Sequence, residues 1–224
     1  EGLFLMTKYM PGKIWVVIGR AGYISHKYGI DIIKTSYVSF IENLTSITSV
    51  LVFSIIGMIK LDLNGNYLLV SIVFFIITIF FLLYQDDLIP LIKHIPLLNR
   101  LSLKPQRFNK IVLYKAITYF FFYWLIIAFS FYFLSLSLLE NPPSHDALFF
   151  LYPISTIIGM IIFIAPGGVG VREGALVMLL STFNFKLSDI IMLAINSRVL
   201  FIICELLIFS SSLLIKRKTV QNFY

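Results

Sequence analysis

Long apolar stretches dominate this sequence, and they limit the chain to one class of fold. Four of them are close to or above the length of about 20 residues that an α-helix needs to cross a bilayer. They are Tyr37–Ile59, Tyr67–Tyr84, Ala116–Leu139 and Ile190–Ile215. Only 13% of the 224 residues are charged, whereas soluble domains have about 25%. The sequence therefore predicts an all-α, polytopic integral membrane bundle, with one transmembrane domain over residues 1–224.

The charges give this bundle an orientation. Residues 85–115 hold six lysines and arginines against two aspartates, and residues 216–218 are Lys-Arg-Lys. The positive-inside rule places such segments in the cytoplasm. We therefore expect a multi-pass protein of the cell membrane, with a basic interfacial loop at 85–115 and the C-terminus both cytoplasmic. The net charge of +7 follows from this distribution, so nucleic acid is not an expected partner.

The residues before the first long stretch are more polar. The segment Tyr23–Lys34 is amphipathic and carries basic residues, which predicts one interfacial helix facing anionic headgroups. Because the chain begins with Glu1 rather than methionine, we expect it to be a piece of a longer protein with further N-terminal spans.

One apolar run is interrupted by helix-breaking residues. Ala147–Ile164 is nearly all apolar, and Ala175–Phe183 after the break is only about half a bilayer long. The break residues are Pro166, Gly167, Gly168 and Gly170, which remove a backbone donor or disfavour a helix. Both flanks of this region should face outside. Either a re-entrant hairpin with its tip at Pro166–Arg172 or a full span with a short return helix fits; we favour the hairpin or a broken pair.

A similar break occurs near the start of the chain. Pro11 and Gly12 interrupt a short apolar segment, followed by Lys13 and Arg20. Two such breaks, one beside a cytoplasmic segment and one beside external segments, are typical of the inverted repeats of many transporters. Proline–glycine pairs also occur in ordinary loops, so the pattern indicates inverted repeats without requiring them.

Charges at the second break indicate a binding site. Arg172 and Glu173 stand where a short helix begins, and the amide groups and dipole of a helix N-terminus attract anions. The guanidinium fork of Arg172 suits bidentate phosphate binding. The alternative is structural: Glu173 would satisfy the dipole and neutralise Arg172.

The last span carries charges as well. Arg198 and Glu205 are seven residues apart, which puts them on one helix face. A charge within a span costs about 2.5–3.5 kcal/mol unless it is paired or hydrated. Arg198 should therefore pair with Glu173, Glu42 or Glu205, either as a structural salt bridge or as part of a substrate site. The full set of candidate headgroup-binding residues is Lys13, Arg20, Glu42, Arg172, Glu173, Arg198 and Glu205.

Other chemistry finds little support. The single cysteine, Cys204, lies within a span, and His26, His94 and His145 fall in three separate loops, so we expect no metal and no cofactor. The sequence has no Asp-x-Asp motif and no pair of carboxylates in one loop suited to acid–base catalysis. We therefore favour a transport protein over an enzyme.

Two motifs of this sequence can be compared with those of known families. The first is Tyr9–Trp15 with Gly19, Arg20 and Glu42; the second and more specific one is Pro166–Ala175. Together they resemble the lysylphosphatidylglycerol synthase transmembrane-region family of flippase-like membrane domains. The resemblance covers nearly the whole chain and implies a polytopic bundle with broken helices. It also implies movement of a lipid between leaflets. The separate aminoacyl-transfer module of the synthases has no room in these 224 residues.

These observations favour a lipid translocase whose partners are membrane lipids with an anionic phosphate headgroup or polyprenyl phosphate. The substrate would be a phospholipid or a polyprenyl-phosphate-linked lipid. The main alternative is a membrane component of a lipid-linked glycosyl or aminoacyl transferase system that has no catalytic domain of its own. In that case a glycosyltransferase or another lipid-modifying enzyme would be its partner. A non-catalytic anchor would not explain charges retained at membrane depth.

Overall fold

The structure, a computed structural model, describes residues 14–92, 110–139, 145–161, 168, 170–183 and 185–221. Within these ranges the regular structure is entirely helical. The helices are α1 (Ile14–Tyr28), α2 (Ile32–Lys60), α3 (Gly65–Ile92), α4 (Lys110–Leu138), α5 (His145–Ile161), α6 (Val171–Ser181) and α7 (Leu187–Gln221). Four helices are long and apolar enough to cross a membrane: α2, α3, α4 and α7. The predicted all-α membrane bundle is confirmed.

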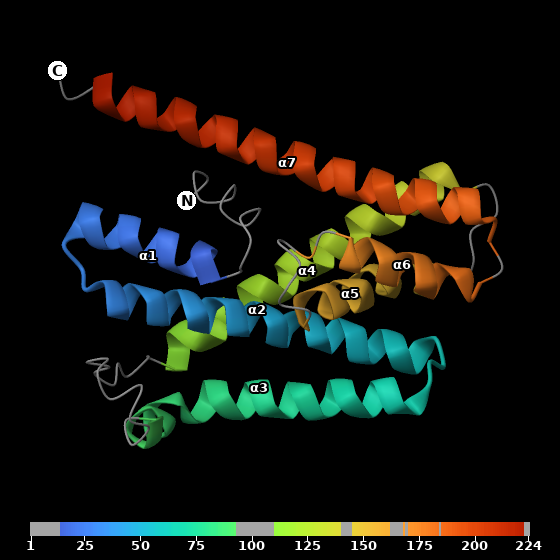
Figure 1. Cartoon of the computed structure of the whole chain (residues 1–224), viewed down its shortest axis with the longest axis horizontal. Coiled ribbons are helices and arrows are strands. Elements are labelled where there is room, and N and C mark those ends of the chain that lie inside the picture. The colour runs from blue at the N-terminus through green and yellow to red at the C-terminus, as the bar shows by residue number, and fades with distance from the viewer. Residues whose placement is uncertain are drawn as a thin grey trace.

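Helix α2 occupies the centre of the bundle and packs against α1, α3, α4 and α5 (Figure 1). Several of its buried hydroxyl groups are satisfied within the helix. Thr45, Ser49 and Ser54 donate to the carbonyl groups four residues earlier, at 2.8, 2.9 and 3.0 Å. Because these side chains are small and leave no donor unpaired, neighbouring helices can approach α2 closely.

Two longer-range hydrogen bonds hold neighbours onto α2. The Trp124 indole of α4 donates to the carbonyl and hydroxyl oxygens of Ser46, at 3.1 and 3.2 Å. Tyr37 donates its hydroxyl to Oε1 of the buried Gln85 of α3, at 3.0 Å. These bonds fix the rotation of α3 and α4 about their axes, which apolar contacts alone do not.

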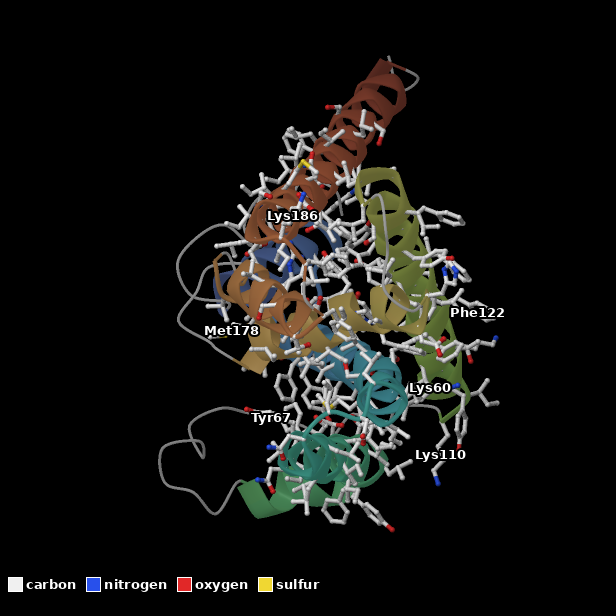
Figure 2. All side chains as sticks on the ribbon, turned by 90° about the vertical axis from the view of Figure 1, so that its right-hand side faces the viewer. Lys60, Tyr67, Lys110, Phe122, Met178 and Lys186 are labelled. Atoms are coloured by element: carbon white, nitrogen blue, oxygen red, sulfur yellow. The ribbon has the colours of Figure 1, made fainter. Side chains whose placement is uncertain are left out.

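The outer helices expose apolar side chains in the way that lipid-facing helices do. Phe122 of α4 points away from the bundle (Figure 2) and is 56% exposed. Further exposed residues are Leu69, Val73, Ile76 and Phe80 on α3, Ile126 and Phe133 on α4, and Ile203 and Leu207 on α7. These surfaces would be costly in water, so they belong in the hydrocarbon.

Helices α5 and α6 form the broken pair. They pack against each other, and the end of α5 and the start of α6 both lie near the middle of the bundle (Figure 1). At a rise of about 1.5 Å per residue, the 11 residues of α6 reach roughly 16 Å, half of the hydrocarbon core. The geometry is that of the predicted re-entrant hairpin. Pro166 and Gly167 lie outside the described residues.

Two short helices mirror each other in the bundle. Helices α1 and α6 both begin near its middle and run to opposite ends. At those ends α2 and α7 begin, and each runs back through the bundle (Figure 1). Each short helix packs on the long helix that follows it. This is the arrangement expected of inverted repeats. Pro11 and Gly12 of the first break lie outside the described residues.

The predicted single interfacial helix over Tyr23–Lys34 is wrong. Helix α1 ends at Tyr28, and Gly29 adopts a φ of +66°, a left-handed conformation that stops helices. Asp31 then caps α2, because its Oδ1 accepts a hydrogen bond of 3.0 Å from the Ile33 amide. The amphipathic pattern thus ran across the junction of two helices.

The basic stretch 85–115 also begins and ends in helix. Helix α3 continues past non-helical backbone angles at Tyr84 to Ile92, and α4 already begins at Lys110. Residues 93–109 lie outside the described residues.

Candidate functional site

Glycines shape the start of α6. Gly168 and Gly170 have φ angles of +70° and +81°, which side-chain-bearing residues rarely adopt. A Cβ on Gly168 would lie 3.2 Å from the Gly159 carbonyl oxygen, and a Cβ on Gly159 would lie 3.1 Å from the Arg172 Cβ. The chain can therefore fold back tightly onto α5, and this close approach brings Arg172 against that helix.

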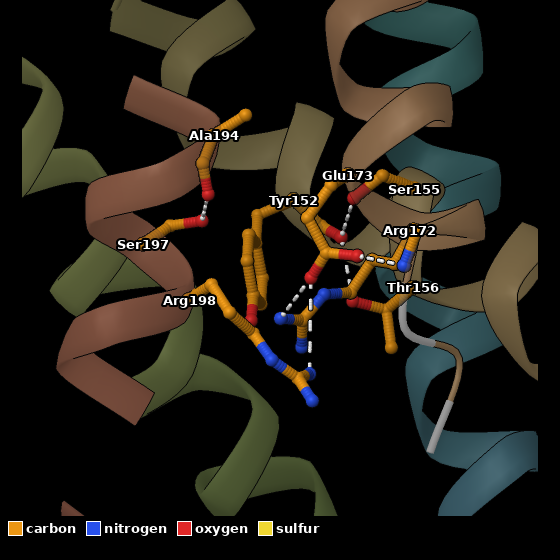
Figure 3. A network of polar contacts seen from close by, with 9 residues as sticks. Tyr152, Ser155, Thr156, Arg172, Glu173, Ala194, Ser197 and Arg198 are labelled. Atoms are coloured by element: carbon orange, nitrogen blue, oxygen red, sulfur yellow. Dashed lines mark hydrogen bonds and ion pairs between the residues drawn. The ribbon is translucent and has the colours of Figure 1, made fainter. Parts of the chain in front are cut away.

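The Glu173 carboxylate makes three contacts at this point (Figure 3). Its Oε2 accepts from the Gly170 amide at 2.8 Å, which caps the N-terminus of α6. Its Oε1 accepts from Nη2 of Arg172 at 2.9 Å and lies 3.7 Å from Nη1 of Arg198 on α7. We call Arg172, Glu173 and Arg198 the arginine cluster. The helix N-terminus thus already holds an anion, Glu173.

The Arg172 guanidinium also lies over two aromatic rings. Its Cζ is 5.1 Å from the ring centre of Tyr152 and 5.5 Å from that of Phe201. The two rings are stacked, with centres 5.2 Å apart and an interplanar angle of 10°. Cation–π contacts of this kind are worth about 0.5–2 kcal/mol and grow with desolvation. They hold the guanidinium in place without occupying its N–H groups.

Three of the seven candidate residues thus meet. Of the acids considered for Arg198, the structure places Glu173 beside it. Glu42 lies on α2 and Glu205 lies two turns beyond Arg198 on α7, and both are partly buried. Arg20 lies in α1, and Lys13 lies outside the described residues. Their roles stay predictions.

Two residues of the site, Tyr152 and Phe201, were not among the sequence candidates. The signal was present in their spacing. Phe201 lies three residues after Arg198 on α7, and Tyr152 lies seven before Gly159 on α5, so each shares a helix face with a residue that the site brings together. Ser155 and Thr156 both donate to the Tyr152 carbonyl at 2.8 Å.

The described residues contain no group of three or more histidine, cysteine or acidic side chains that could hold a metal ion. The arginine cluster offers positive charge and hydrogen-bond donors to a ligand. Such groups suit an oxyanion.

The comparisons with known proteins agree with this architecture. The sequence matches the family described as the lysylphosphatidylglycerol synthase TM region over residues 3–208. Neither curated proteins nor solved structures gave a significant match. The matched range contains both glycine-containing breaks and the whole arginine cluster. The chain therefore belongs to the family of lysylphosphatidylglycerol synthase transmembrane regions and is an integral membrane protein of lipid metabolism or translocation.

Proposed function

We propose that this protein is a lipid translocase, which passes the phosphate headgroup of a lipid across the bundle while the acyl or prenyl tails stay in the bilayer. The observation that carries the proposal is the arginine cluster at the start of a half-length helix in the middle of the bundle (Figures 1 and 3). The substrate would be a phospholipid or a polyprenyl-phosphate-linked lipid.

A purely structural role explains this cluster poorly. Each charge at membrane depth costs about 2.5–3.5 kcal/mol, and buried ion pairs are commonly no more stabilising than apolar residues of the same size. Arg172 is 14% exposed and gives one hydrogen bond to Glu173. Its other N–H donors find no acceptor among the described residues. They are available to a phosphate.

The placement of the helix ends supports an orientation for the proposed transport. The end of α3, the start of α4 and the end of α7 lie at the same end of the bundle (Figure 1). These are the ends rich in lysine and arginine, so this end would be cytoplasmic. The α5–α6 hairpin would then enter from the outer face.

Reconstitution tests the proposal directly. Liposomes with fluorescent phosphatidylglycerol, phosphatidylethanolamine or polyprenyl phosphate would be treated with dithionite, which quenches only the outer leaflet. We expect the protein to speed the quenching of inner-leaflet lipid, and Arg172→Gln to slow it about 10- to 150-fold. This range corresponds to charge-assisted hydrogen bonds of about 1.5–3 kcal/mol. Lys186→Gln, which neutralises an exposed lysine between α6 and α7, is the matched control.

Two further measurements distinguish a role of Arg172 in transport from a role in protein stability. Arg172→Gln should melt in detergent close to the wild type, because Glu173 keeps Arg198 as a partner, and Arg172→Lys should recover only part of the activity because it lacks the fork. The proposal fails if no labelled lipid crosses faster with protein than without it. If Arg172→Gln unfolds instead, Arg172 is a structural ion-pair partner.

A further inference from the structure

The Tyr152 hydroxyl group stands apart from the other buried polar groups. Tyr152 is 1% exposed, and its hydroxyl has no hydrogen-bond partner within the described residues. The ring itself is packed on both faces, with ring centres 4.9 Å from Phe131 and 5.2 Å from Phe201. A phenylalanine would keep this stacking without burying an unpaired hydroxyl, which carries a desolvation cost. The stacking therefore does not explain the tyrosine.

The unpaired hydroxyl lies beside an incompletely paired guanidinium. Cζ of Arg172 is 5.1 Å from the Tyr152 ring centre, and the hydroxyl points to the same side as the guanidinium groups of Arg172 and Arg198 (Figure 3). Arg172 donates one hydrogen bond to Glu173, and the described residues supply no acceptor for its remaining donors. A buried hydroxyl and a partly buried guanidinium, both able to donate hydrogen bonds, thus converge at the N-terminus of α6.

The hydrogen-bonding properties of Arg172 and Tyr152 limit which ligand could bind to both. Arginine only donates hydrogen bonds, whereas a phenol can donate one and also accept. A single partner that bonds to both groups must therefore be an acceptor. A cation is excluded by the two guanidinium groups. A tetrahedral oxyanion has several acceptor oxygens pointing in different directions, so it can meet both the planar fork of Arg172 and a hydroxyl outside that plane.

From this we infer that Tyr152 is a ligand-binding residue of the site: its hydroxyl donates a hydrogen bond to a phosphate oxygen that Arg172 holds at the start of α6. The inference rests on the proposed function only in taking the phosphate from a lipid headgroup. Inorganic phosphate offers the same oxygens. Phe201 and Phe131 would then serve to hold the phenol ring in register with the guanidinium.

The test uses the full chain in detergent. Its affinity would be measured by thermal shift with sodium phosphate alone or with short-chain phosphatidylglycerol, each against sodium chloride at equal ionic strength. Tyr152→Phe keeps the aromatic stack and should weaken binding about tenfold or more, since a hydrogen bond to a charged group is lost. Tyr67→Phe, on the exposed face of α3, is the control and should bind like the wild type.

The melting temperature without ligand supplies a second reading. Because Tyr152→Phe removes an unpaired buried hydroxyl, this variant should melt at the wild-type temperature or above it. A lower melting temperature would mean that the hydroxyl is already bonded inside the protein, which would overturn the inference. Unchanged affinity of Tyr152→Phe, or a wild type that binds neither probe, would overturn it too.

The same variants separate this inference from the proposed function. Suppose that sodium phosphate binds as well as phosphatidylglycerol, in a Tyr152-dependent manner, and that no lipid crosses the liposome membrane. The phosphate site at Tyr152 is then supported and the translocase function is rejected. If lipid crosses equally fast in Tyr152→Phe and its affinity is unchanged, the translocase stands and the Tyr152 site is lost. Preference for phosphatidylglycerol, with slower crossing in Tyr152→Phe, supports both.

Discussion

At the scale of single residues, one carboxylate organises the site. Glu173 caps α6 through the Gly170 amide, bonds to Arg172 and neutralises Arg198. With these three contacts, the carboxylate is the counter-ion of two arginines and also caps the N-terminus of α6. It also lies where a phosphate would bind Arg172, so the protein's own anion and the ligand would share the same guanidinium.

We expect Glu173→Gln to lower the melting temperature, because it leaves two guanidinium groups without their shared counter-ion. Breaking a buried pair costs about 3–5 kcal/mol, and the loss here should be near 3 because these side chains keep 14–19% exposure. Thermal melts of the two single variants and of the double variant Arg172→Gln/Glu173→Gln measure their coupling. A double variant less stable than Glu173→Gln alone would contradict the ion-pair account.

At the scale of elements, close helix contacts decide the arrangement. Helix α2 meets α5 at Gly57, where an added Cβ would lie 2.5 Å from the Phe150 Cβ and 3.1 Å from the Ile154 Cδ1. The Cβ of Phe150 is attached to the backbone, so it cannot move away as the tip of a flexible side chain can. The α5–α6 hairpin is therefore seated on α2 through a contact that only glycine allows.

Gly57→Ala should destabilise the protein by about 1–3 kcal/mol, the cost of overpacking, although alanine favours a helix by roughly 1 kcal/mol. Gly65→Ala is the matched control, because nothing lies within 4 Å of a Cβ at that position. Melting in detergent would measure the difference. If both variants melt at the same temperature, the α2–α5 contact is looser than the structure indicates.

At the scale of the whole molecule, the two ends of the bundle differ in charge. Lys110 begins α4 at one end, and Asn66 follows the α2–α3 turn at the other (Figure 1). Both are exposed, so both can be replaced by cysteine in a Cys204→Ser background. The positive-inside rule puts Lys110 in the cytoplasm.

A membrane-impermeant maleimide should therefore label Asn66→Cys in intact cells, and label Lys110→Cys only after permeabilisation. Permeabilised cells serve as the control that both cysteines react. Labelling of Lys110→Cys from outside would invert the proposed orientation and place the hairpin's open end in the cytoplasm.

The sequence by itself determined the class of fold, the four spans and the position of the break. These features depend only on local sequence. A bilayer is crossed by a certain number of consecutive apolar residues, and a cluster of proline and glycine fails to continue a helix. It did not place the junction at Gly29, because an amphipathic pattern does not reveal a left-handed glycine followed by an Asp31 cap.

Only the tertiary structure decided which charges and rings meet. Glu42, Glu173 and Glu205 were equal candidates for Arg198, and the fold of α6 onto α5 and α7 put Glu173 there. The unpaired Tyr152 hydroxyl could not be foreseen either, because a tyrosine in an apolar stretch looks like any other lipid-facing aromatic. Whether its hydroxyl is buried without a partner depends on how α5 packs between α4 and α7, whose Phe131 and Phe201 cover the two faces of its ring.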